Sequence, residues 1–384
     1  MRERKIYIII FLGVTFLFWT TLYLYVPTLP TYIKSKVINL SMVGFVLSMY
    51  GLCQLIFRLP LGIAVDSTGR GKPFIIAGLS MAVLGAFIMG RGYGLGMLAV
   101  GRSLTGIGAA TWVPLLVVFS TFFSAEEAIF SSTMLTLTAN LGRVVGSSLS
   151  GIITRAGGYA LPFYLSAITG IIAVGIASFI KEKGGFSEGV SLRSIGLLII
   201  RKDVALPAII SVIVHHVDYT ITFSFLPILA QEMGASDVVK SVIISLNLAS
   251  VTAANLINTL MLRKTSHTIL LCCGAFLFFF GIVMISLSPS LYLLFCGTIL
   301  MGFAFGIVYP ILIGMGIHKV ERNQRNTAMG IHQSIYAIGM WTGPWVTGIL
   351  AGILGMQNTF LITGGFYLIT VYILIYFLLR NKNV

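Results

Sequence analysis

The sequence predicts an all-α membrane protein with twelve transmembrane helices in two pseudo-symmetric bundles of six. Its composition, the length of its apolar runs and an internal repeat predict this fold. Hydrophobic residues are 57% of the 384 residues and charged residues only 9%, whereas a soluble domain carries roughly 25% charged residues. So few charges cannot cover a surface that faces water, and lipid must therefore surround most of the chain.

Apolar runs long enough to cross a bilayer follow one another along the chain. A transmembrane helix needs about 20 mostly apolar residues. The first run begins after Arg2, Arg4 and Lys5 and contains no small-residue cleavage site, so we expect a retained helix rather than a signal peptide. The predicted spans are 6–33, 41–65, 73–91, 95–122, 128–153, 161–180, 204–230, 239–262, 267–287, 291–315, 327–353 and 358–379.

The basic residues indicate the orientation of these spans. The net charge is +14, but Lys and Arg stand singly or in small groups between apolar runs. This pattern is typical of cytoplasmic loops beside anionic lipid, and it does not suggest a nucleic-acid partner. With the N-terminus inside, most basic residues fall inside, so we expect a multi-pass protein of the cytoplasmic (inner) membrane with both termini in the cytoplasm. The basic residues expected outside are Lys34, Lys36, Arg91, Arg155 and Lys240.

The longest polar connection runs from Lys181 to Asp203 and divides the chain near its middle. It predicts an N-terminal six-helix bundle over 1–180, a cytoplasmic linker over 181–203 and a C-terminal six-helix bundle over 204–384. Within the linker, the apolar piece from Arg193 to Arg201 has basic ends, which is the pattern of a segment that lies along the membrane surface.

The two halves repeat one pattern of glycine and proline. In each half a Gly–Pro pair falls in the fourth span and a GxxxG pair in the fifth, at nearly one sequence offset between the halves. Such a repeat is typical of transporters that build alternating access around a site at the bilayer midplane. The matched positions are Gly106 and Pro114 with Gly302 and Pro310, and Gly142 and Gly146 with Gly339 and Gly343.

The loop after the second span carries the most specific pattern. Gly62, Asp66, Gly69, Arg70 and Lys72 are spaced as in the GxxxDxxGR(x)K signature of the major facilitator superfamily, which the whole chain resembles. Gly62 is expected to let two helices approach closely, and Gly69 to permit a sharp turn. The resemblance implies the major facilitator fold and a loop that latches one state of the transport cycle. The alternative is an ordinary basic turn at the cytoplasmic face.

Two further patterns resemble this superfamily. Arg102 lies in a stretch similar to its RxxxGxGAA motif, which implies a role in proton coupling or substrate contact; the alternative is an arginine that reaches the outer interface. A glycine pattern resembles the exporter-associated GxxxGPxxGG motif. It predicts close helix packing and is weak support for export. Its positions are Gly142 and Gly146 in the fifth span and Gly339, Gly343 and Pro344 in the eleventh.

The seventh span contains Asp218, the one acidic residue well inside a predicted span, beside His215, His216 and Tyr219. His215 lies about one turn from Asp218 and from Tyr219, so these three share a helix face. Burial favours a neutral carboxyl group and a nearby cation favours the charged form, so this group is a candidate for proton coupling or substrate contact. Arg143 is the expected opposite charge for Asp218. The alternatives are a structural ion pair and a metal site.

The leading hypothesis is secondary active transport of a small organic solute by alternating access, as proton-coupled efflux, because the motifs resemble the drug:proton antiporter branch. The first alternative is a proton-linked uptake symporter for a nutrient. The second is an intramembrane enzyme that uses His215, His216 and Asp218. The sequence contains no P-loop and no paired catalytic motif, so we expect no cofactor and no enzyme activity. The superfamily resemblance implies a monomer.

Overall fold

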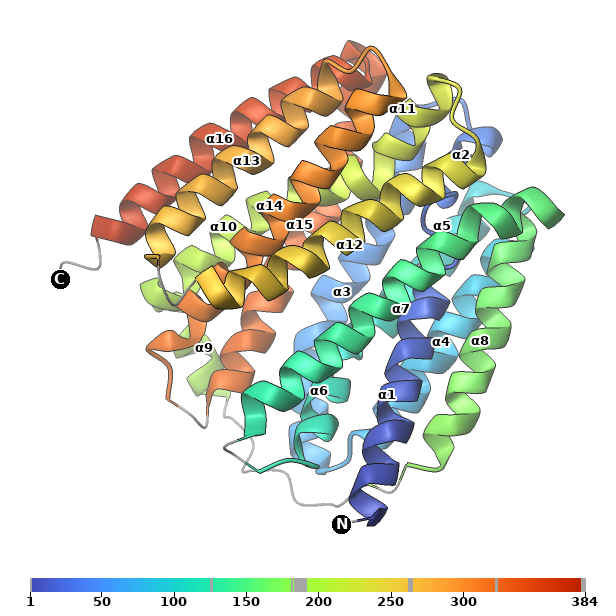
Figure 1. Cartoon of the computed structure of the whole chain (residues 1–384). Coiled ribbons are helices and arrows are strands. Elements are labelled where there is room, and N and C mark those ends of the chain that lie inside the picture. The colour runs from blue at the N-terminus through green and yellow to red at the C-terminus, as the bar shows by residue number, and fades with distance from the viewer. Residues whose placement is uncertain are drawn as a thin grey trace.

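The computed structural model describes residues 2–124, 127–180, 182, 192–261, 265–321 and 324–380, and within them the chain forms helices and no strand (Figure 1). This confirms the predicted all-α fold class. The helices are α1 (Arg2–Tyr23), α2 (Leu29–Lys36), α3 (Leu40–Thr68), α4 (Lys72–Gly90), α5 (Leu95–Ala110), α6 (Trp112–Ser120), α7 (Ala128–Gly157), α8 (Ala160–Ser178), α9 (Leu192–Ile200), α10 (Lys202–Thr220), η2 (Ile221–Phe225), α11 (Leu226–Glu232), α12 (Asp237–Met261), α13 (His267–Ser286), α14 (Leu291–His318), α15 (Arg325–Leu354) and α16 (Met356–Arg380).

The predicted spans correspond to these helices. Among the described residues, 11 helical stretches are long and apolar enough to cross a membrane. The twelfth long helix is α7, which has 30 residues and packs against both α1 and α12. Its serine and threonine residues lower its hydropathy, although its length exceeds what a bilayer requires. Each predicted span overlaps one of these helical stretches.

The first predicted span is not one continuous helix. α1 ends at Tyr23, and the chain turns through residues 24–28 before α2 begins at Leu29. Pro30 lies in the first turn of α2, where its missing N–H removes no helical hydrogen bond. Figure 1 shows α2 beside α11 at one end of the bundle, here called the α2/α11 end. The start of α1 at Arg2 and the end of α16 at Arg380 lie at the opposite end, here called the terminus end.

The seventh span also departs from a regular helix. A π-helical turn at Ile221–Phe225 separates α10 from α11. Within it, the Ser224 hydroxyl donates a hydrogen bond of 2.7 Å to the Tyr219 carbonyl. Such turns insert one extra residue into a helix and are often found at functional sites. Here the turn follows Asp218 and Tyr219 directly, at the middle of the predicted span.

The two halves repeat the same helix neighbours. α7 packs against α1 as α15 packs against α10, and α5 packs against α3 and α4 as α14 packs against α12 and α13. α8 packs against α4 as α16 packs against α13. Between the halves, α3 contacts α15 and α7 contacts α12. The internal repeat of the sequence therefore corresponds to a repeat of packing.

Glycines lie where the helices come closest. A Cβ atom at Gly142 in α7 would lie 2.5 Å from the Phe16 carbonyl oxygen of α1, and one at Gly339 in α15 would lie 2.0 Å from the Val212 carbonyl oxygen of α10. A side chain cannot be placed at such distances, so these contacts require glycine. Gly146 and Gly343 lie one turn further along the same two contacts. A Cβ atom there would lie 2.9 Å from the Thr20 carbonyl oxygen and 2.4 Å from the His216 carbonyl oxygen, respectively.

The apolar piece of the linker forms α9. Ile195 and Leu198 are buried in a cluster with Val204 and Ala328, whereas Leu197 is exposed. One face of α9 thus packs on α10 and α15, and the other faces outward, as in an amphipathic helix. Residues 181 and 183–191 of the linker lie outside the described residues. The bundle bounds 1–180 and 204–384 therefore remain a proposal.

Candidate functional site

A cavity of about 560 Å³ lies between the two halves. Helices α1, α3 and α7 line it on one side, and α10, α12, α14 and α15 on the other. Among the described residues, none from α2 or α11 lines it. Toward the terminus end, the lining reaches to within two turns of the ends of α6 and α14 and of the starts of α7 and α15, at Leu116, Ile313, Ser132 and Met329. The cavity is therefore directed toward the terminus end.

Asp218 reaches this cavity from α10. It is 5% exposed, and its Oδ1 accepts a hydrogen bond of 3.0 Å from the Thr222 hydroxyl in the π-helical turn. Among the described residues that line the cavity, Asp218 is the one carboxylate. Tyr219 also lines the cavity, and its ring is stacked near that of Tyr50 in α3, with 6.4 Å between centroids. A single buried carboxyl group thus lies where the two halves face one another.

The two histidines point in different directions. His215 lines the cavity, and its Nδ1–H donates to the Ser211 carbonyl oxygen at 2.8 Å, while its ring lies 3.9 Å from that of Tyr336 at an interplanar angle of 9°. His216 instead contacts α15, where its Nδ1 is 3.0 Å from the Thr342 hydroxyl. No hydrogen bond joins His215 to Asp218 in the described part of the chain. The cluster expected from sequence spacing is therefore divided, because neighbouring residues on a helix point about 100° apart.

Arg143 lies in the cavity wall but does not form the expected ion pair. Its guanidinium lies 3.7 Å from the ring of Trp19 and 5.6 Å from that of Tyr23. The salt bridges found among the described residues do not include Arg143 with Asp218. The indole face holds the cation by a cation–π interaction, and Asp218 is bonded to Thr222 instead. The predicted pairing is therefore wrong for this conformation, although both groups line one cavity.

Arg102 lies behind the cavity wall. It is 4% exposed, and its guanidinium lies 4.1 Å from the ring of Tyr50. Tyr50 lines the cavity, whereas Arg102 does not. Arg102 therefore does not face the cavity in this conformation. Its position is consistent with holding Tyr50, since a cation over an aromatic face orients the ring.

Arg58 in α3 is a cavity residue that the spacing arguments missed. Its guanidinium donates hydrogen bonds to the Gln54 amide oxygen at 2.5 Å, to the Tyr336 hydroxyl at 2.6 Å and to the Gln333 carbonyl at 3.2 Å. Two of these acceptors belong to α15 in the other half. The signal that could have found Arg58 was its place inside a predicted span, because a charge in the membrane normally faces a cavity or a partner.

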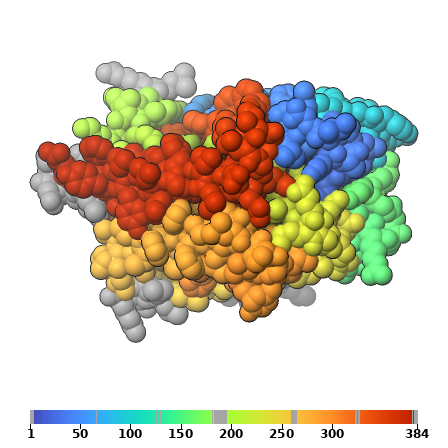
Figure 2. All heavy atoms as spheres, turned by 90° about the horizontal axis from the view of Figure 1, so that it is seen from above, coloured from blue at the N-terminus to red at the C-terminus, as the bar shows by residue number. Residues whose placement is uncertain are grey.

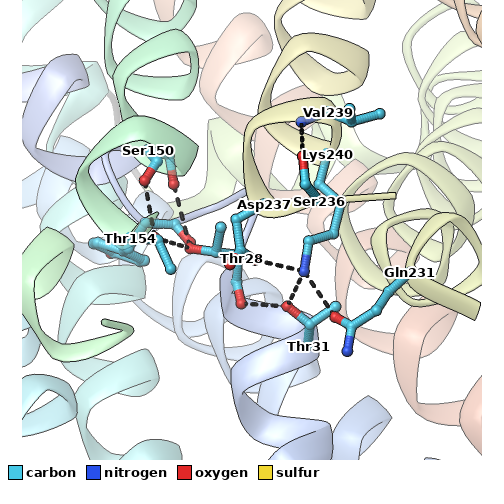
Figure 3. A network of polar contacts seen from close by, with 10 residues as sticks. Thr28, Thr31, Ser150, Thr154, Gln231, Ser236, Asp237, Val239 and Lys240 are labelled. Atoms are coloured by element: carbon cyan, nitrogen blue, oxygen red, sulfur yellow. Dashed lines mark hydrogen bonds and ion pairs between the residues drawn. The ribbon is translucent and has the colours of Figure 1, made fainter. Parts of the chain in front are cut away.

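The α2/α11 end of the bundle is closed by a network centred on Lys240 (Figure 3). The Lys240 ammonium donates to the Thr31 hydroxyl at 3.0 Å and to the Gln231 amide oxygen at 2.7 Å, and it forms an ion pair of 2.7 Å with Asp237. Lys240 is 1% exposed and lies in the first turn of α12. The sequence placed it in an outside segment, and its burial between α2, α11 and α12 is a finding of the structure.

Other contacts between the halves accompany this network. Lys34 of α2 forms an ion pair with Glu232 of α11, and the Ser148 hydroxyl of α7 lies 3.0 Å from that of Ser245 in α12. A Cβ atom at Gly151 would lie 2.2 Å from the Asp237 carbonyl oxygen. Figure 2 looks down from above and shows the blue segment that holds α2 adjoining the yellow segment around α11 and the start of α12.

The α3–α15 contact also closes this end. A Cβ atom at Gly44 would lie 2.1 Å from the Pro344 carbonyl oxygen, and one at Gly51 would lie 2.4 Å from the Met340 carbonyl carbon. Pro344 of the predicted packing motif therefore contacts the other half as well as lying within α15. Backbone contacts this close require glycine.

The loop between α3 and α4 is bonded within its own half. Gly69 ends α3 with a φ of 64°, a left-handed conformation that glycine adopts readily. The Lys72 ammonium donates to the Ser178 carbonyl at 2.6 Å, and its backbone N–H donates to the Glu182 carboxylate at 3.2 Å. Arg70 is exposed. The side chain of Asp66 lies outside the described residues.

The close helix approach expected at Gly62 is not observed. A Cβ atom there would meet Val113 at 3.7 Å, which is ordinary van der Waals contact. Gly62 lies in the part of α3 near the terminus end, where the cavity extends. A glycine with spare room at this end is consistent with a packed arrangement in another conformation.

This fold and its central cavity define a membrane transporter. The profile of the Major Facilitator Superfamily matches residues 11–205 and 208–384, and the chain belongs to this superfamily. It is similar to the inner membrane transport protein YajR of Escherichia coli strain K12, at 23% identity over 88% of this chain and 76% of the relative. It is also similar to multidrug resistance protein 2 of Bacillus subtilis strain 168, at 25% identity over 95% of this chain and 93% of the relative.

Solved structures share the fold. A bacterial homologue of the human lysosomal transporter Spinster, in an inward-facing and unoccupied conformation, has a TM-score of 0.82 at 12% identity and covers 97% of this chain and 96% of its own. The nucleoside transporter NupG has a TM-score of 0.78 at 15% identity and covers 96% of this chain and 98% of its own. At these identities the likeness concerns the fold alone.

Proposed function

We propose that this chain is a secondary active transporter that moves a small organic solute through its central cavity by alternating access, with a proton carried by Asp218. The observation that carries the proposal is the position of this carboxyl group. It lies buried on the wall of the cavity between the halves, beside the π-helical turn. A titratable group inside the membrane is a functional residue by default, because burying it without a role is costly.

Alternating access requires the two ends to exchange their contacts. In this state the α2/α11 end is closed by the Lys240 network and by glycine contacts, whereas the cavity is directed toward the terminus end. We propose that the terminus end faces the cytoplasm, because basic residues are concentrated there. The structure then represents an inward-facing state. In the outward-facing state, we propose that the α3–α4 loop, with Gly62, Asp66 and Arg70, packs against the C-terminal half.

Proton coupling follows if Asp218 changes its charge during the cycle. Its carboxyl group has one neutral hydrogen-bond partner, the Thr222 hydroxyl, in the described chain. Gain or loss of a proton therefore changes the net charge of the cavity by one unit, in surroundings where charge is expensive. If the inward-facing and outward-facing states bind this proton with different affinities, protonation favours the state with the higher affinity. Proton binding is then linked to the end at which the cavity is open.

The direction of transport has two candidates. Export is supported by relatives named as resistance proteins, including the tetracycline resistance protein, class B, of Escherichia coli, which is 28% identical over 41% of this chain and 39% of its own. Uptake with a proton is favoured by a specific observation, which is that cations outnumber the carboxylate in the cavity wall. A negative solute and the proton on Asp218 would then assist each other's binding.

An enzyme is a poor fit to the geometry. His215, His216 and Asp218 do not converge on one point, because His216 faces α15 and not the cavity. A catalytic group needs its partner within about 3 Å. The superfamily and the relatives are transporters. We therefore propose transport, without a chemical step on the solute.

The test is solute-evoked proton flux in sealed proteoliposomes that hold the full chain. A panel of organic cations, anions and neutral solutes is added to wild type, to Asp218→Asn and to the matched control Glu321→Gln, which removes an exposed carboxylate outside the spans. We expect one class of solute to move protons with wild type and with the control, but not with Asp218→Asn. The sign of the flux separates export by antiport from uptake by symport. Equal flux in Asp218→Asn would remove Asp218 from the coupling.

A further inference from the structure

The charges of the cavity wall point to the chemical class of the solute. Apart from tyrosine hydroxyls, which are neutral near pH 7, the charged or titratable groups that line it in the described chain are Arg58, Arg143, Asp218 and His215. Two guanidiniums thus face one carboxylate, so the wall carries an excess of positive charge whether or not Asp218 is protonated. Arginine remains charged under all conditions in a protein. In a low-dielectric site such an excess attracts an anion strongly.

The positive charge of Arg58 is solvated but not neutralised. All three acceptors of its hydrogen bonds, in Gln54, Gln333 and Tyr336, are uncharged. Its Nε is buried and has no hydrogen-bond partner in the described chain. A buried cation is normally paired with an anion, and Arg58 has no such pair among the salt bridges of the described residues. Within the described chain Arg58 has no counter-ion, and an anionic solute in the cavity could supply one.

Arg143 offers the geometry for a ligand carboxylate. Its guanidinium lies against the indole of Trp19 at 3.7 Å. A cation–π contact of this kind leaves N–H donors of the guanidinium free for a carboxylate, which an arginine can bind in bidentate fashion. Its Nε is also buried without a hydrogen-bond partner in the described chain. Stacking on Trp19 orients the donors before the solute arrives, which lowers the entropy cost of binding.

Aromatic rings make up much of the remaining wall. Trp112, Tyr50, Tyr219, Phe223 and Tyr309 line the cavity together with Trp19. Flat rings of this kind favour offset or edge contacts with another aromatic ring. We infer, on the basis of the proposed transport function, that the solute is an aromatic organic anion whose negative group is bound between Arg58 and Arg143.

The test compares ligands that share one aromatic ring system and carry a negative, a neutral or a positive group of similar size. Purified full-length protein in a neutral detergent is titrated with 2-naphthoate, with 2-naphthamide and with 2-naphthylmethylammonium, and the dissociation constants are measured by ligand-induced thermal stabilisation. We expect 2-naphthoate to bind at least about tenfold more tightly than the other two, as the loss of a charge-assisted pair predicts. Equal binding of the three, tighter binding of the ammonium compound, or no binding of 2-naphthoate would each overturn the inference.

Variants locate the site. Arg143→Gln and Arg58→Gln should each lower the affinity for 2-naphthoate by about tenfold or more. Arg143→Lys and Arg58→Lys should retain part of the affinity. They replace a glutamine variant that does not fold. Arg155→Gln is the matched control, because Arg155 is exposed in the last turn of α7, about three turns away from Arg143. Asp218→Asn should raise the affinity for 2-naphthoate, because it removes a negative charge that repels the ligand carboxylate. Unchanged binding in all the arginine variants at Arg58 and Arg143 would place the ligand elsewhere and overturn the assignment.

This experiment separates the two proposals. If the ammonium compound binds best and evokes proton flux, the inferred anion is wrong and the transport function stands. If 2-naphthoate binds through Arg143 but evokes neither proton flux nor uptake in proteoliposomes, the anion site stands and the proposed transport fails for this ligand class.

Discussion

The Arg58 guanidinium in α3 donates a hydrogen bond of 2.6 Å to the Tyr336 hydroxyl in α15, and so joins the two halves at the wall of the central cavity. The same cation also holds the Gln54 amide oxygen and the Gln333 carbonyl oxygen. Hydrogen bonds to charged groups contribute about 1.5–3 kcal/mol each. Arg58 therefore connects the solute site to the α3–α15 contact that closes the α2/α11 end.

Arg58→Lys tests this connection. A lysine ammonium is compact and lacks the planar fork, so it cannot serve three acceptors in the arginine geometry. We expect a lower apparent unfolding temperature in detergent and a transport rate reduced by about tenfold, which corresponds to about 1.4 kcal/mol. Tyr336→Phe removes one acceptor and should have a smaller effect. Wild-type stability and rate in Arg58→Lys would show that Arg58 does not tie the halves.

Lys240→Met tests the closed end. Methionine is unbranched and only one atom shorter than lysine, but it loses the contacts to Thr31, Gln231 and Asp237. The outward-facing state should therefore become more populated. The measurement is the labelling rate of a cysteine at Leu248, a buried cavity residue, by a membrane-impermeant maleimide from the α2/α11 side. We expect an increase on the order of tenfold, as loss of about 1.4 kcal/mol would give.

The control for this experiment is Lys36→Met. Lys36 is exposed at the same end, and the contact that it makes is with the ring of Tyr32 in its own helix. Lys36→Met therefore changes the net charge of the α2/α11 end without removing a contact between the two halves. If the cysteine at position 248 is labelled at the same rate in both variants and in the parent protein, the Lys240 network does not keep the α2/α11 end closed.

Gly339→Ala tests the close packing of α15 on α10. The new methyl group would lie 2.0 Å from the Val212 carbonyl oxygen, which is backbone and cannot move aside alone. Overpacking of this kind costs about 1–3 kcal/mol. We expect a lower unfolding temperature in detergent, whereas Gly330→Ala, in the same helix with no atom within 4 Å of the new methyl group, should leave it unchanged. An equal response of the two variants would show that the contact is not needed for stability.

Asp218→Asn should retain exchange of solute across the membrane but lose proton-driven accumulation of the solute. The amide keeps the size of the side chain and can still bond to Thr222, but it cannot carry a proton. We expect solute counterflow without a proton gradient to continue, while accumulation driven by an imposed pH gradient disappears. The rate of counterflow should also lose its dependence on pH. Loss of both activities in a folded variant would mean that Asp218 has a structural role.

The fold could be predicted from sequence because bilayer thickness and loop charge constrain each span separately. The interruptions of the first and seventh spans could not be predicted in the same way. α1 stops at Tyr23, and the π-helical turn at Ile221–Phe225 divides the seventh span, yet the apolar runs continue through both places. Such breaks depend on proline position and on neighbouring helices that replace the lost hydrogen bonds, and hydropathy does not register either.

The site was predicted in part. Asp218 and Arg143 do line one cavity, as their presence inside spans suggested. His216 and Arg102 do not, because the spacing along one helix does not reveal its rotation relative to its partners. The burial of Lys240 could not be predicted, because it depends on the neighbouring helices α2 and α11, which the sequence of α12 does not reveal.

The central claim is that this chain alternates between two states that open opposite ends, and distances between spin labels test it most directly. After replacement of the four native cysteines, one label pair is placed at Tyr93 and Tyr292 on the α2/α11 end, and a second at Phe179 and Lys319 on the terminus end, all of them exposed positions. We expect two populations of each distance in lipid nanodiscs. Lys240→Met, or a change of pH, should lengthen the first distance and shorten the second together. A single unchanging distance at both ends under every condition would contradict it.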